Sequence, residues 1–241
     1  MRVGVVCEGP TDFFAVKSFF GHALENALAA PVEFIALQPQ MDKTNPEAGW
    51  GNVLLWLANN PPVSRVQQYF GGGLFAGALG SDPLDALLIQ LDSDILGDRL
   101  FKDYVFKSYN LTVENPTQQD ERAKEISRVL QEAAQFINMT AIDVRRHVIA
   151  PAVEATESWC VAAFNAQAMN CEDLSGQRLV DAFMVALEKS EGRIPSLPYA
   201  NTDKDQRRRE IFCNKHASGS ARVIEGCPAF ERAFLQLRDL A

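Results

Sequence analysis

The chain has 241 residues, of which 47% are hydrophobic, and a formal net charge of -8 at pH 7. This composition is sufficient for a large folded core, and the acidic balance disfavours indiscriminate binding to phosphate backbones. Long apolar runs and a charged, then apolar, leader are absent, so we expect no membrane span, no signal peptide and a cytoplasmic location. The five cysteines are odd in number and widely spaced, which argues against a secreted disulfide framework.

The chain is predicted to begin with a buried strand, a tight loop and a helix. A valine-rich run at 2–7 is followed by Glu8, a Gly-Pro turn and a broad apolar helical pattern over 13–29. This order places Glu8 at the carboxyl end of a strand, the edge at which open α/β sheets keep their chemistry. Asp12 could contact a metal ion through water or cap the helix together with Thr11, and we favour capping.

The next elements are a strand, a loop and a helix. The β-rich run 32–37 predicts the second strand, the turn-rich segment 39–49 a loop at the edge of the site, and 50–58 a helix. The glycine-rich segment 71–80 lacks the Gly-Lys-Ser/Thr ending of a phosphate-binding P-loop. We therefore interpret it as a surface loop.

A second group of carboxylates follows the hydrophobic run 87–91, which predicts another buried strand. This run ends in Asp92-Ser93-Asp94, and in an extended Asp-x-Asp segment both side chains point the same way. With Glu8, three carboxylates then lie at the tips of two strands. Carboxylates repel one another at this density unless a cation lies between them, and hard oxygen ligands suit Mg²⁺ or Mn²⁺ better than zinc.

These carboxylates also have structural interpretations. Glu8 could accept backbone N–H groups at the helix N-terminus, and Asp92 or Asp94 could form an Asx turn at the strand end. We favour the functional interpretation because an unpaired carboxylate near the interior is costly without a cation or hydrogen-bond donors.

The second half of the chain predicts more helices than strands. A long amphipathic helix is expected over 120–137, a short strand at 148–150, further helices at 173–189 and 229–240, and a loop at 192–205. The pattern as a whole predicts an α/β fold with a mostly parallel sheet flanked by helices. We expect 1–96 to hold the first part of this core, 97–145 to be a mainly helical insertion, and 146–241 to complete the core.

The arrangement of a strand, Glu-Gly-x-Thr-Asp and a helix, followed by a hydrophobic strand with Asp-x-Asp, resembles the Toprim family. This Rossmann-like, metal-dependent catalytic fold is shared by topoisomerases, primases and OLD-type nucleases. The resemblance implies that Glu8, Asp92 and Asp94 form the metal and acid/base centre. The Gly-Trp segment at 49–53 and a lysine-containing tail at 215–234 are similar to features of small stand-alone Toprim-like bacterial proteins related to OLD-type nucleases.

A Glu-x-Trp segment is a further point of resemblance. Glu154 and Glu157 are three residues apart, which predicts that they share one face of a helix. As an ordinary pair they would be exposed to solvent, whereas the resemblance makes Glu157 a candidate metal ligand or a group that orients one. Trp159 is expected in the core. Lys215 could neutralise a scissile phosphate or a leaving oxygen, or be an ordinary surface base.

A nucleic-acid substrate would have to meet a confined basic patch in this acidic chain. The densest cluster comprises Lys204, Arg207, Arg208 and Arg209, and the segment 145–147 is a smaller second candidate. A basic run of this kind is usually a solvated helix face. It is a candidate for phosphate contacts here because the rest of the chain offers no comparably dense cluster.

These features predict a Mg²⁺-dependent, Toprim-type nuclease that cleaves phosphodiester bonds of DNA or RNA. Asp92 and Asp94 would hold one or two metal ions, Glu8 would act as ligand or general base, and Lys215 would assist the leaving group. The resemblance further implies an effector role in bacterial anti-phage defence with a separate ATPase partner, since the chain has no Walker motif.

Two alternatives remain open at this point. One is a non-catalytic, metal-binding interaction subunit of a defence or DNA-repair complex, and the other is a different phosphotransfer enzyme on a similar fold. The sequence also leaves open whether DNA or RNA is the substrate and whether the chain forms a homo-oligomer.

Overall fold

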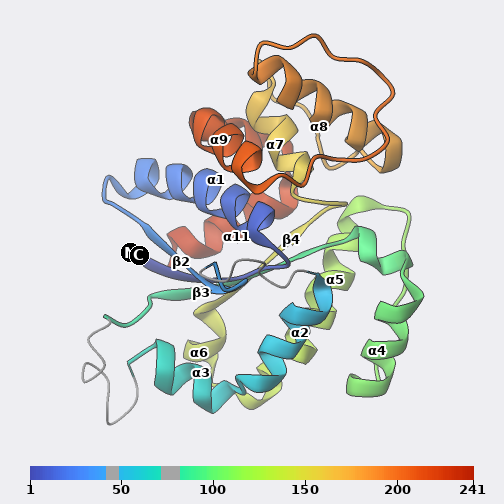
Figure 1. The fold of residues 1–241 in the computed structure, drawn as a ribbon. Helices are drawn as coiled ribbons and strands as arrows, with labels where there is room; N and C mark the ends of the chain where they lie inside the picture. Colours follow the sequence, from blue (N-terminus) through green and yellow to red (C-terminus); the bar gives the residue numbers. More distant parts are fainter. Residues whose placement is uncertain (42–48, 72–81) are drawn as a thin grey trace.

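The computed structural model describes residues 1–41, 49–71 and 82–241, and within them it is an α/β fold. Four parallel strands form one sheet in the order β2-β1-β3-β4, which confirms the predicted fold class (Figure 1). The strands are β1 (Arg2–Val6), β2 (Glu33–Gln38), β3 (Ala86–Asp92) and β4 (His147–Ala152).

The central strands show why the carboxylates meet. All seven residues of β3 are buried, and its sequence is nearly continuous in apolar residues, as expected for a parallel strand covered on both faces. Val6 of β1 is in register with Ile89, and Asp92 with Ala152 of β4. The carboxyl ends of three strands therefore lie at the same edge of the sheet.

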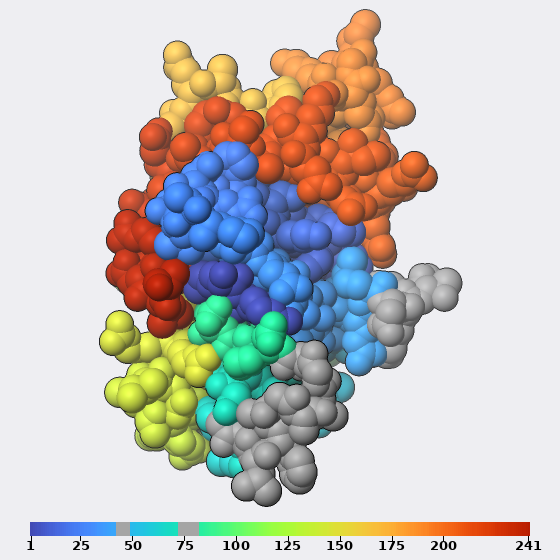
Figure 2. All heavy atoms as spheres, turned by 90° about the vertical axis from the view of Figure 1, so that its left-hand side faces the viewer, coloured from blue at the N-terminus to red at the C-terminus, as the bar shows by residue number. Residues whose placement is uncertain are grey.

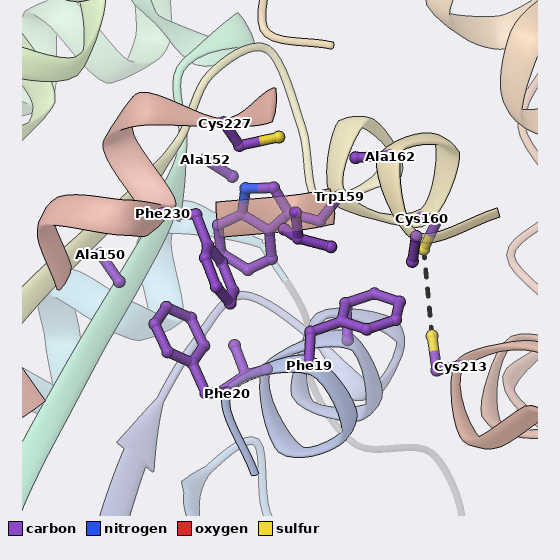
Figure 3. Packing of buried hydrophobic residues seen from close by; sticks show 14 of the residues in the cluster. Phe19, Phe20, Ala150, Ala152, Trp159, Cys160, Ala162, Cys213, Cys227 and Phe230 are labelled. Carbon is purple, nitrogen blue, oxygen red and sulfur yellow. Dashed lines mark hydrogen bonds between the residues drawn. The ribbon is translucent and has the colours of Figure 1, made fainter. Parts of the chain in front are cut away.

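One face of the sheet is covered by α1 (Pro10–Leu28) and by helices from the C-terminal third. These are α7 (Glu157–Phe164), α8 (Gly176–Ser190), α9 (Gln206–His216), α10 (Ser220–Gly226) and α11 (Pro228–Arg238). Phe20, Trp159 and Phe230 join α1, α7 and α11 in an aromatic cluster, with Phe20 stacked on Phe230 at 3.9 Å between centroids (Figure 3). Trp159 is fully buried, which confirms its predicted place in the core.

The opposite face is covered by helices from the middle of the chain (Figure 1). These are α2 (Trp50–Asn59), α3 (Pro62–Tyr69), α4 (Arg99–Tyr109), α5 (Gln119–Ala133) and α6 (Ala141–Arg145). Helix α5 buries Ile126, Val129 and Leu130 in the second core cluster, alongside β3 residues. The segment 97–145 is thus helical, and it covers this face as the connection from β3 to β4. Figure 2 shows the C-terminal residues (red) above the yellow-green part of this connection.

Several element boundaries differ from expectation. Helix α1 begins at Pro10, because a proline in the first turn lacks only an N–H that no intrahelical carbonyl would accept. Glu154 has a positive φ of 58° and precedes α7, so the prediction that it shares a helix with Glu157 is wrong. The predicted loop 39–49 lies largely outside the described residues, and so does the glycine-rich segment 71–80. In the described part of the chain, no helix has the length and apolar character needed to cross a membrane.

Candidate functional site

Glu8 and Asp92 meet at the carboxyl ends of β1 and β3. The backbone N–H of Asp92 donates to Glu8 Oε1 at 2.9 Å, which ties the loop after β1 to the last residue of β3. Gln90 Nε2 donates to Asp92 Oδ1 at 2.7 Å and so fixes that carboxylate from inside the sheet. Asp94 follows in the short 3₁₀ turn η1 (Asp94–Gly97). The prediction that these acids lie at one edge of the sheet agrees with this placement, but the prediction of an extended Asp-x-Asp is wrong, because Ser93 has helical dihedral angles (φ -92°, ψ -6°) and Asp94 begins the 3₁₀ turn.

Asp12 joins the same cluster, and its predicted capping role is wrong. Helix α1 has Gly9 at its N-cap and no side-chain cap, whereas Asp12 is buried and its Oδ1 accepts a 2.7 Å hydrogen bond from Thr156 Oγ1. The physical reason is that Asp12 lies in the first turn, on the side of α1 that faces the start of α7. Thr156 comes 144 residues later in the chain, so local sequence patterns contain no sign of this contact.

Burial and mutual repulsion make this cluster reluctant to ionise. Burial, followed by the charge of Asp12, raises the pKa of Glu8 to about 8. Burial and the charge of Glu154 raise the pKa of Asp94 to about 6, and burial followed by Asp12 raises the pKa of Asp92 well above its usual value. Glu8 and Asp92 therefore hold protons near neutral pH unless a cation replaces them, whereas Asp94 is largely ionised there.

Glu157 behaves in the opposite way, because it has two cationic partners. Its side chain is 1% exposed, and Oε1 lies 2.5 Å from Arg209 Nη2 and 3.3 Å from Lys204 Nζ. Burial opposes ionisation, but the charges of Arg209 and Lys204 outweigh it and hold the pKa of Glu157 at about 2. Oε2 of Glu157 is buried without a hydrogen-bond partner in the described structure, so the group still has an acceptor to offer.

Lys204 supplies the accessible positive charge of the site. Its side chain is 66% exposed, and besides Glu157 it faces Asp12 and Asp92, whose charges help to raise its pKa against the opposing effect of burial. A lysine in this position has a mobile ammonium group next to a set of carboxylates. It can therefore contact an anionic substrate that approaches them.

The predicted basic run does not form one solvated face. Arg209 is buried over the Phe183 ring at 4.3 Å, and Arg208 forms ion pairs with acidic side chains of α8 and the preceding loop. Arg207 is exposed. Consecutive residues of a helix point about 100° apart, so three arginines in a row cannot share one face. The proposed joint role of Lys204, Arg207, Arg208 and Arg209 in phosphate contacts thus reduces to Lys204 at the carboxylates and Arg207 on the surface.

Lys215 is placed away from the carboxylates. It donates to the backbone carbonyl of Ser190 at the end of α8. It lies six residues beyond Arg209 on the same helix, or about 9 Å along the axis. The lysine that the fold brings to the cluster is Lys204.

An arginine that the sequence did not single out supports the Asp-x-Asp turn. Arg122 of α5 donates through Nη2 to the Ser93 carbonyl at 2.6 Å and lies 3.1 Å from Glu154 Oε1 through Nε. Glu154 in turn donates its N–H to Ser93 Oγ at 2.8 Å and accepts from the N–H of Asp94 through its carbonyl. These contacts hold Asp92 and Asp94 in position relative to β4.

The carboxylate oxygens at this edge of the sheet are of the kind that a hard divalent ion prefers. Glu8, Asp92 and Asp94 offer carboxylate oxygens, which Mg²⁺ and Mn²⁺ prefer, and the raised pKa values show that a positive charge would be favourable there. Within residues 1–41, 49–71 and 82–241, no three Asp, Glu, His or Cys side chains are grouped as a ready metal-binding set. Comparisons of the chain with protein-family models, curated proteins and solved structures found no match.

Proposed function

We propose that this protein is a Mg²⁺- or Mn²⁺-dependent nuclease of the Toprim type that hydrolyses phosphodiester bonds of DNA or RNA. The observation that carries the proposal is the direct link between Glu8 and Asp92 at the tips of two neighbouring parallel strands. Their raised pKa values support it, because carboxylates that resist ionisation alone are stabilised by a bound cation.

Glu8, Asp92 and Asp94 would hold the ion. Its chemistry would be to lower the pKa of a bound water and to neutralise charge on the phosphate. Glu8, whose pKa is about 8 before an ion binds, would either ionise as a ligand or accept a proton from water as a general base. Lys204 would contact the phosphate. The sequence pattern indicated Lys215 instead for the neutralisation of the phosphate or of the leaving oxygen.

The polar groups behind these residues would keep them in place. Asp12 is fixed by Thr156, and Glu157 is fixed by Arg209. We place the activity in bacterial anti-phage defence, with a separate ATPase as partner, on the strength of the family resemblance described above.

Cleavage assays with mixed DNA and RNA substrates test this proposal. The substrates are incubated with Mg²⁺, Mn²⁺ or EDTA and with wild type, Glu8→Gln or Asp92→Asn. We expect cleavage that EDTA abolishes and that each substitution lowers by about 100-fold or more, because each removes a charge that a metal ion requires. Asp103→Asn, which changes an exposed carboxylate of α4, should retain full activity.

A binding measurement separates metal binding from catalysis. Mg²⁺ or Mn²⁺ should raise the melting temperature of wild type and of Asp103→Asn but not that of Asp92→Asn, since a ligand stabilises only the folded state that binds it. Lys204→Met should weaken cleavage about tenfold without abolishing metal binding. Lys215→Met should leave cleavage unchanged. Metal binding without any cleavage would instead favour the metal-binding interaction subunit, and the absence of both would refute the proposal.

A further inference from the structure

Strand β4 is an edge strand of the sheet, and its outward backbone groups have no hydrogen-bond partner within residues 1–41, 49–71 and 82–241. The N–H of Leu87 donates to the Arg146 carbonyl, and the N–H of Ser93 donates to the Ala152 carbonyl. In a parallel ladder with this register, alternate residues of β4 pair with β3 and those between them point their backbone groups outward. His147 and Ile149 therefore direct both N–H and C=O away from the sheet.

Pro151 fits this assignment. A proline within a strand is tolerated where its nitrogen faces outward, because no ladder hydrogen bond is lost there. Pro151 is the third outward residue of β4 and offers only its carbonyl. The outer side of β4 thus presents two donors and three acceptors in a row, which is the pattern that another strand can pair with.

A groove of about 610 Å³ lies along this edge. All three outward residues, His147, Ile149 and Pro151, line it. Its walls come from α5 and α6 on one side and from α11 on the other, so it spans both faces of the sheet at the edge. Phe136 and Leu240 add apolar surface.

The side chains that line this groove include four cations, of which Arg145 is the one without an ion pair among the described residues. Lys124, Arg128, Arg145 and Arg232 face it, against a single acid, Asp239. This is the reverse of the balance in the whole chain, whose net charge is -8. Three of the cations also pair with acids of α5. Arg145 is exposed at the mouth.

A buried arginine beneath the groove adds to its positive potential. Arg65 is fully buried, and its Nε donates to His147 Nε2 at 3.1 Å. Its other acceptors in the described part of the chain are the carbonyls of Asn60 and Ala134 and the Met139 sulfur, all of them neutral. A buried cation with neutral acceptors favours negative charge nearby.

We propose that this groove is a docking site for an extended, acidic segment of a partner protein, which adds as a strand beside β4. Backbone hydrogen bonds to His147 and Ile149 would give affinity, and acidic side chains that reach Arg145 and the neighbouring cations would give specificity. The proposal does not depend on the activity of the carboxylate site. Binding in this groove would bring the chain to its partner protein.

Fluorescence anisotropy with a dye-labelled peptide tests the backbone part of the proposal. The probes are peptides of about eight residues that alternate Glu with Val, Ile or Phe, a length that covers an edge strand. We expect saturable binding that is lost when alternate peptide nitrogens are methylated. Ile149→Pro removes an outward N–H without removing a bond to β3 and should weaken binding at least about tenfold, whereas Ile149→Val should not.

Charge reversal tests the electrostatic part. Arg145→Glu should weaken binding about tenfold, and Arg178→Glu, on an exposed arginine of α8, should leave it unchanged. Circular dichroism and urea midpoints confirm that the variants fold. The proposal is overturned if none of the probes binds, if methylated peptides bind as well as unmethylated ones, or if a single-stranded oligonucleotide of equal charge displaces the peptide. The last result would make the groove a nucleic-acid site.

Discussion

Two buried glutamates show how the neighbours of a residue decide its protonation. Glu157 has Arg209 and Lys204 beside it, and its pKa lies at about 2. Glu172 is also buried, but its main hydrogen bond is from the backbone N–H of Ala229 at the start of α11. Burial raises the pKa of Glu172 to about 7 against the favourable effect of that bond. Glu157 is thus ionised in the core, whereas Glu172 titrates near neutral pH.

Glu172 predicts a specific dependence of stability on pH. Its pKa is about 7 in the folded state and near 4.5 in the unfolded state. The stabilisation by the neutral form is therefore complete below pH 4.5 and is lost as the pH rises to about 7. The loss is on the order of 3 kcal/mol at most. Glu172→Gln keeps an acceptor for Ala229 and cannot ionise, so its free energy of unfolding should fall less than that of wild type over this range.

Urea unfolding at pH 4.5, 6 and 8 checks this result. Other groups titrate in the same range, so the quantity of interest is the difference between the two proteins. Arg232 lowers the pKa of Glu172 and Asp120 raises it, and both remain in the variant. Glu225→Gln, an exposed substitution on α10, should follow wild type at every pH. Parallel curves for wild type and Glu172→Gln would show that Glu172 does not carry this dependence.

At the scale of elements, α10 packs so closely on its neighbours that side chains are excluded at two positions. A Cβ at Gly219, just before α10, would collide with the backbone of Ala163 in α7. A Cβ at Gly226, its last residue, would collide with the carbonyl oxygen of Met169. Backbone atoms cannot move aside as a flexible side chain can. Gly51 in α2 differs, since nothing lies within 4 Å of its Cβ position.

These glycines make a matched pair of substitutions. Gly219→Ala should lower the free energy of unfolding by about 2 kcal/mol or more, because α10 must shift away from α7. Gly51→Ala should raise it by about 0.5 to 1 kcal/mol, because alanine favours the helix and restricts the unfolded chain. Urea denaturation of both variants measures the two effects. An unchanged Gly219→Ala would mean that α10 can withdraw from α7 without loss.

The elements that the sequence predicted well are those with a clear pattern. Strand β3 and helices α1 and α5 agree with expectation, because a continuous apolar run or an amphipathic face marks each of them. Helix α7 was assigned a wrong start, since seven of its eight residues are buried and a helix buried all round has no periodicity. The short helix α3 was not predicted at all, and only two of its eight residues are buried.

At the scale of the whole molecule, the site combines predictable and unpredictable parts. Glu8 and Asp92 could be found because both lie at the carboxyl ends of strands, and parallel strands end at a common edge. The contact between Lys204 and Glu157 could not be predicted from sequence. The loop that carries Lys204 reaches the site because α8 packs on α7, and no local pattern indicates that packing. Local patterns assign faces to elements, whereas the contacts between distant loops depend on how the layers assemble.

The two faces of the sheet carry separate apolar clusters, and whether they unfold together is a property of the whole chain. The three tryptophans divide between them, with Trp159 in the first cluster and Trp50 and Trp56 packed on the second. Every residue of β3 is buried between the clusters, and α5 packs on both β3 and β4. We therefore expect one cooperative transition that includes the segment 97–145.

Trp159 can report on this coupling from across the sheet. In a Trp50→Phe/Trp56→Phe background, Trp159 fluorescence and far-UV circular dichroism should give the same urea midpoint. Val129→Ala removes two buried methyl groups from α5 on the opposite face and should cost about 2 kcal/mol, which should appear undiminished in the Trp159 transition. Ile137→Ala, at a side chain that is 90% exposed, should leave the midpoint unchanged. If Val129→Ala left the urea midpoint of Trp159 fluorescence unchanged, the segment 97–145 would be an independently folding insertion. A layer that is part of the same cooperative unit cannot lose packing without destabilising the sheet it covers.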